Sequence, residues 1–251
     1  MDIKEIKRSY KSSKKQLKKE YKAQLSEYEA HRRTLSNKEP PKDPPKRHLL
    51  EEIGNAVTHG AGSVFSIVAY VLMLLSSDRD AEYLSATIYF VGMLFMFTMS
   101  CLYHAFAHGS AVKRLFRRFD YTGIYLLIGA TFSPPLLAFI GGTFGTVFSI
   151  VQWSVIAVGI VFVAVFGPTK FRGLHIPLYV VLGWSALLLM PSLIKGSFSL
   201  AMWILGGGIA YTLGIIPFMM KSKISHFVWH FFVLAGAVIQ WVGIYLYIFL
   251  P

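Results

Sequence analysis

Seven apolar segments, each long enough to cross a bilayer, follow one another through most of this sequence. A helix of about 20 residues, rising 1.5 Å per residue, spans the roughly 30 Å hydrocarbon core of a membrane. The hydrophobic fraction of 54% over 251 residues is too high for an ordinary soluble domain. The sequence therefore predicts an all-α, polytopic membrane protein built as a seven-transmembrane helix bundle. The expected segments are 54–75, 83–105, 119–140, 144–166, 174–193, 200–219 and 225–249.

Short polar or glycine-rich breaks separate the segments, so successive helices are expected to pack as antiparallel neighbours. The run KRLFRR at 113–118 is predicted to be one of these loops. Pro134 and Pro135 lie inside the third segment and are expected to kink or end its regular helix. The triplet Gly206, Gly207 and Gly208 in the sixth segment favours close helix approach.

Positive charge sets the expected orientation. If the N-terminus is cytoplasmic, 23 of the 25 Lys and Arg residues fall on the inner side, and the exceptions are Arg79 and Lys195. The positive-inside rule therefore predicts a cytoplasmic N-terminus and an external C-terminus. We expect a multi-pass protein of the cell (plasma) membrane.

The sequence predicts two parts, a basic cytoplasmic tail with a Pro-rich linker at 1–52 and the transmembrane domain at 53–251. The tail carries most of the net charge of +12. One interpretation is a solvated, partly helical extension. The other is an arm on anionic lipid headgroups, where each Lys or Arg adds about 1 kcal/mol. Nucleic-acid binding is possible on charge alone, but no specific feature of the sequence supports it, so none is expected. The arm would carry a weak heptad-like stripe of Ile3, Tyr10, Leu17, Tyr21, Tyr28 and Leu35.

A pair of histidines opens the seventh segment. His226 and His230 are four residues apart, so on a helix both imidazoles face the same way. Ionisable residues at membrane depth are expensive and are usually functional. The simplest occupant of the shared point is a divalent metal, with zinc the first candidate, provided that another element supplies a third ligand.

Other polar residues fall on the same side of the bundle. In a seven-helix topology, odd segments start inside and even segments end inside, which places His59, Ser100, His104 and Asp120 in the same cytoplasmic half as the histidine pair. His104 would complete a set of three imidazoles, and three protein ligands plus a water are typical of catalytic zinc. His108, four residues further on, is a rival partner for His104.

Two of these residues have more than one interpretation. Asp120 would hold or deprotonate a metal-bound water, or it would cap its helix or pair with Arg117. His59 shares a helical face with Glu51 and Asn55. His59 and Asn55 would therefore line the same cavity and contact the metal ligands without binding the metal, or they would form polar packing between helices. The remaining histidines, His31, His48 and His175, are expected to carry no chemistry.

Together these residues match a family pattern: Glu51-x3-Asn55-x3-His59, Ser100-x3-His104, Asp120-Tyr121 and His226-x3-His230. Over about residues 50–251, the chain resembles the hemolysin III family, the bacterial branch of the progestin and adipoQ receptor superfamily. The resemblance implies a seven-helix bundle with a cytoplasmic N-terminus and a zinc ion near the cytoplasmic side. The implied ligands are His104, His226 and His230. Asp120 and Ser100 fall on positions that hold the zinc-bound water or line its site.

Three functions follow as hypotheses. The superfamily is similar to alkaline ceramidases, so the resemblance implies a metal-dependent hydrolase of a lipid amide or related lipid, with a role in membrane lipid homeostasis. The second hypothesis is a receptor-like or sensor protein with structural zinc, which the sequence does not separate from the first. The third is a pore-forming haemolysin with cytolytic activity. No segment reads as an amphipathic, pore-lining helix, which argues against the third.

Overall fold

The computed structural model describes residues 2–36, 44–220 and 222–250, and contacts divide the chain into two compact units, residues 1–41 and 42–251. The first unit contains the 34-residue helix α1 (Ile3–Ser36). Its apolar residues Ile3, Tyr10 and Leu17 are all exposed. Most of the predicted Pro-rich linker, residues 40–43, lies outside the described residues.

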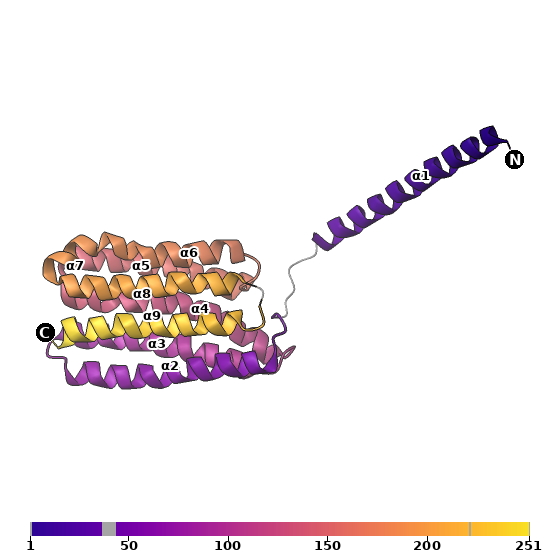
Figure 1. Cartoon of the computed structure of the whole chain (residues 1–251). Helices are drawn as coiled ribbons and strands as arrows, with labels where there is room; N and C mark the ends of the chain where they lie inside the picture. The colour runs from indigo at the N-terminus through magenta and orange to yellow at the C-terminus, as the bar shows by residue number, and fades with distance from the viewer. Residues whose placement is uncertain (1, 37–43, 221, 251) are drawn as a thin grey trace. The chain divides into compact units, whose positions relative to one another are not determined.

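The second unit is an all-helical bundle, and its described residues contain no strand (Figure 1). Its first helices are α2 (Leu49–Leu75), α3 (Asp80–Ala105), α4 (Ala111–Ser133) and α5 (Gly142–Phe166). A π-helical segment, Pro134–Ile140, continues α4. The second half contains α6 (Arg172–Trp184), a 3-10 turn (Ser185–Leu188), α7 (Met190–Gly196), α8 (Phe198–Met219), α9 (Ser225–Ile244) and a closing π-helical turn (Tyr245–Phe249).

Six of the described helical segments are long and apolar enough to cross a membrane, and a seventh span results if the bent pair around α6 and α7 is one span. That pair turns by 44° at its break. Pro191, at the start of α7, lacks the N–H that would continue the hydrogen-bond ladder, which explains a break near this position. The all-α polytopic membrane fold is confirmed, but the predicted segment 174–193 is not one straight helix.

The start of α4 corrects one sequence prediction. Lys113 and Arg117, which were predicted to lie in a loop, are inside α4 and only 1% and 7% exposed. Ser110 caps this helix, because its hydroxyl accepts a hydrogen bond from the Lys113 backbone N–H at 3.0 Å. Asp120 is therefore in the helix interior, and the interpretation of Asp120 as a cap is wrong. The prediction for the proline pair is confirmed, since the regular helix ends at Ser133.

Packing in the bundle runs from neighbour to neighbour. Helix α2 packs against α3 and α9, α3 against α4, α4 against α5, and α8 against α9. The core between them includes the fully buried side chains of Tyr89, Met93 and Phe97 from α3. The outward faces of α2 and α5 carry exposed valines, among them Val64 and Val158. An apolar exterior is what lipid tails require of a spanning bundle, in which helices satisfy their own backbone groups.

The close packing of α8 on α9 at Gly207 can be tested by substitution. A Cβ at Gly207 would lie 2.2 Å from Gln240 Cγ and 2.9 Å from the Gly236 carbonyl oxygen, whereas a Cβ at Gly208 would meet nothing within 4 Å. We expect Gly207→Ala to cost about 1–3 kcal/mol and to lower the melting midpoint by roughly 2–12 °C. Gly208→Ala is the matched control and should be neutral or slightly stabilising. Thermal unfolding in detergent measures both, and equal midpoints would contradict the close packing of α8 on α9.

Candidate metal centre

Three histidines from two helices meet at one end of the bundle. His104 lies in the last turn of α3, and His226 and His230 lie in the first turns of α9. Each offers one ring nitrogen, and these three atoms lie within 4.8 Å of one another. The ring centroids of His104 and His230 are 4.8 Å apart, and those of His226 and His230 are 4.9 Å apart. The cluster could hold a metal ion.

The donor atoms fit such an ion. Nε2 of His104 and Nδ1 of His230 are buried and have no hydrogen-bond partner among the described residues. An unsatisfied buried polar atom costs roughly 1–3 kcal/mol, and bonding to a metal would remove that cost. Imidazole nitrogens are common zinc ligands, so these three rings would suit such an ion.

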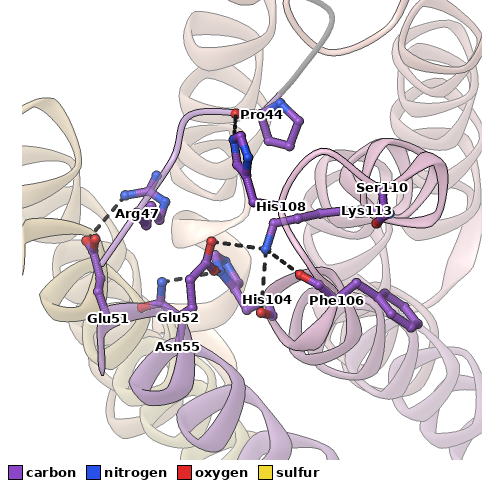
Figure 2. A network of polar contacts seen from close by, with 10 residues as sticks. All are labelled: Pro44, Arg47, Glu51, Glu52, Asn55, His104, Phe106, His108, Ser110 and Lys113. Atoms are coloured by element: carbon purple, nitrogen blue, oxygen red, sulfur yellow. Dashed lines mark hydrogen bonds and ion pairs between the residues drawn. The ribbon is translucent and has the colours of Figure 1, made fainter. Parts of the chain in front are cut away.

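The Nδ1 side of His104 faces a polar network that sequence reasoning missed (Figure 2). Glu52 Oε2 lies 2.5 Å from His104 Nδ1, and Glu52 Oε1 lies 3.0 Å from Lys113 Nζ. Asn55 Nδ2 also approaches His104 Nδ1, at 3.3 Å. The i,i+4 spacing had selected Glu51, whose carboxylate instead pairs with Arg47 at 3.3 Å. The sequence did contain a signal for Glu52, because it lies three residues before Asn55 and residues at that spacing share one side of a helix.

His59 and Asn55 lie against the cluster. The His59 ring is tilted by 30° over His230, with centroids 3.8 Å apart, and His59 is 1% exposed. Asn55 is fully buried beside His104. Both side chains therefore contact a candidate ligand, from α2. Their supporting role stays a prediction.

Ser100 and Asp120 line a polar cavity of about 560 Å³ next to the histidines. The cavity wall also includes His59, His226 and His230. Its basic lining residues are Lys46, Arg47, Arg117 and Lys223. The two residues predicted to act on a water thus share one space with two of the candidate ligands.

A second cavity, of about 160 Å³, is almost entirely apolar. Its lining includes Leu127, Ile128 and Val180. The two cavities share five lining residues: Met96, Tyr121, Ile124, Phe218 and Trp229. An amphiphilic molecule could therefore place its polar end near the histidines and its apolar end between the helices.

The other described histidines are elsewhere. His108 is exposed, and its Nε2 lies 3.0 Å from the Pro44 carbonyl oxygen. His175 is buried, and its Nδ1 is 2.9 Å from the Tyr125 hydroxyl. His48 caps α2 by accepting a hydrogen bond from the Leu50 N–H. The His31 side chain lies outside the described part of the structure.

Similarity to known proteins decides the family. The family model described as "Haemolysin-III related" matches residues 47–241. The chain belongs to the hemolysin III family. The resemblance that the motifs predicted is confirmed, as is membership of the wider progestin and adipoQ receptor superfamily.

The alignments of this hemolysin III family member with its relatives cover most of both chains. "Hemolysin-3" of Bacillus cereus is 32% identical over 208 residues, 80% of this chain and 93% of that protein. "Hemolysin-3 homolog" of Bacillus subtilis (strain 168) is 35% identical over 197 residues, 75% and 90% of the two chains. The human "Monocyte to macrophage differentiation factor" is 27% identical over 225 residues, 86% and 92% of the two chains.

Proposed function

We propose that this protein is a zinc-dependent hydrolase of a lipid amide or related lipid, active within the membrane and serving membrane lipid homeostasis. The observation that carries the proposal is the convergence of the His104, His226 and His230 ring nitrogens beside a cavity lined by Asp120 and Ser100. Zinc held by three imidazoles would supply a Lewis acid that activates water for attack on a carbonyl.

The protein's own residues would provide proton transfer and orientation. The Asp120 carboxylate would accept the proton of the attacking water, and the Ser100 Oγ–H would donate a hydrogen bond to the substrate carbonyl oxygen. Ser100 is 1% exposed, so its hydroxyl is held in a low-dielectric environment, where such an interaction is stronger. Asp120 lies three turns into α4, whose rigid backbone fixes the carboxylate relative to the histidines.

The apolar cavity supports a lipid substrate. Its wall of leucine, isoleucine and valine side chains suits an acyl chain, and it adjoins the polar cavity through shared lining residues such as Tyr121 and Trp229. A substrate with a carbonyl near its polar end and a long tail would reach both cavities.

A substrate panel tests the proposal. Purified protein in lipid nanodiscs is incubated with ceramides, N-acyl amides and phospholipids, with and without a zinc chelator, and free fatty acid is measured by mass spectrometry. We expect chelator-sensitive release from at least one amide and recovery after zinc is restored. Metal binding without release from any lipid would contradict the hydrolase and favour a sensor in which zinc is structural.

The printed names of two relatives, "Hemolysin-3" and "Hemolysin-3 homolog", support a second candidate, membrane permeabilisation. Dye release from liposomes that contain the purified protein separates the candidates. A hydrolase without a pore leaves the dye inside, whereas a pore releases it whether or not a chelator is present.

We further propose that the N-terminus is cytoplasmic in the plasma membrane, where α1 binds anionic lipid headgroups. Positive charge supports both statements, since α1 contains eleven Lys and Arg against four Glu. Its exposed Tyr10, Leu17 and Tyr21 offer apolar contacts to a lipid surface.

A further inference from the structure

We propose that Glu52 and Lys113 form a clamp that fixes the ring orientation and tautomer of His104, so that Nε2 faces the metal position. The inference rests on the proposed metal site and not on hydrolysis. Glu52 comes from α2, His104 from α3 and Lys113 from α4, so the clamp joins three helices around one ring (Figure 2). These are positioning residues, because they would act on the metal only through His104.

The contacts at Nδ1 decide where the ring hydrogen lies. The Glu52 carboxylate can only accept, so its 2.5 Å contact requires Nδ1–H. The Asn55 amide nitrogen can only donate, so its 3.3 Å contact requires a bare Nδ1. The Glu52 acceptor is a charged carboxylate, which makes its hydrogen bond the stronger of the two. His104 therefore carries its hydrogen on Nδ1 and leaves the Nε2 lone pair free.

Lys113 holds Glu52 in place for this task. The ammonium is 1% exposed and is bound by three oxygens, those of Glu52 Oε1 at 3.0 Å, the Phe106 carbonyl at 3.0 Å and the His104 carbonyl at 3.5 Å. Burying a charge is costly unless it is paired and hydrogen-bonded, so this ammonium needs a carboxylate beside it. Lys113 thus contacts both the Glu52 carboxylate, which orients the His104 ring, and the backbone at the end of α3 that carries His104.

The location of His104 explains why a clamp is needed. Helix α3 ends at Ala105, so His104 is one residue from the helix end, where the hydrogen-bond ladder frays. His226 and His230 share one helical face four residues apart, whereas His104 must be held in register from another helix. The ion pair between α2 and α4 fixes that register.

Metal affinity tests the clamp without any lipid substrate. The apo-protein in nanodiscs is titrated with Co²⁺ in competition with a chromophoric chelator, and the visible absorption of bound Co²⁺ reports the ligand geometry. We expect Glu52→Ala to weaken binding about 10–100-fold and to shift the Co²⁺ bands. Glu52→Gln keeps the shape and a neutral acceptor, so it should lie between Glu52→Ala and the unsubstituted protein.

Two more variants separate the clamp from general destabilisation. Glu82→Gln breaks the ion pair between the buried Glu82 carboxylate and the exposed Arg79 side chain at the opposite end of α3, and it should leave Co²⁺ affinity and spectrum unchanged. Lys113→Met should weaken Co²⁺ binding, and combined with Glu52→Gln it should add less than the two single effects together, because both residues act through one ring.

The outcomes are distinguishable. If Glu52→Ala and Glu52→Gln both bind Co²⁺ with the affinity and spectrum of the unsubstituted protein, the clamp is refuted. A second outcome is that the unsubstituted protein binds Co²⁺ tightly and Glu52→Ala weakens this binding, but no lipid is hydrolysed. In that case the clamp stands and the proposed hydrolase function fails.

Discussion

Replacement of His104 by alanine should abolish metal binding by the purified protein. The variant removes one of three converging ring nitrogens, and the remaining pair from α9 would leave two ligands where zinc needs at least three. We expect metal content to fall from about one ion per chain to below about one tenth, with any hydrolysis lost as well. Elemental analysis of protein in detergent measures the metal directly.

His108→Ala is the matched control for this prediction. His108 lies four residues after His104, is exposed, and contacts the Pro44 carbonyl instead of the cluster. The control should keep its full metal content. Stoichiometric metal in His104→Ala, or metal loss in His108→Ala, would show that the assigned ligand set is wrong.

Replacement of Asp120 by asparagine should reduce turnover while leaving the metal bound. The amide keeps the shape of the side chain but cannot take a proton from water, so the expected loss is about 10²- to 10⁴-fold in kcat. Steady-state kinetics on the substrate found in the lipid panel give kcat, and elemental analysis of the same preparation gives the metal content.

Asp80→Asn controls for the loss of a carboxylate in general. Asp80 is exposed at the first residue of α3, the opposite end of the helix from His104, and its variant should retain full turnover. Two results would contradict the role of Asp120. Metal loss in Asp120→Asn would make the residue a ligand, and unchanged turnover would remove it from the mechanism.

Hydropathy predicted most of the fold because membrane insertion is decided locally. Each helix in a bilayer must satisfy its backbone groups within its own segment, so a run of about 20 apolar residues specifies a spanning helix. The predicted ends of the second and fourth segments, Ala105 and Phe166, are the observed ends of α3 and α5. The proline pair ended the regular part of α4 as expected.

The same reasoning failed where charge is paired across helices. The run at 113–118 was predicted to be a loop because hydropathy scores Lys113 and Arg117 as surface residues. Lys113 is buried because Glu52, 61 positions earlier in the sequence, supplies its counter-charge. The partner of a buried charge is a property of the packed helices, and no local window contains it.

What the sequence determined by itself was the helical membrane bundle and the shared face of His226 and His230, because both follow from periodicity within one segment. Tertiary structure decided that His104 lies close to that pair. It also decided that Glu52, and not Glu51, contacts the His104 ring. Glu51 and Glu52 are adjacent but point about 100° apart around α2, so only the position of α3 beside α2 selects between them.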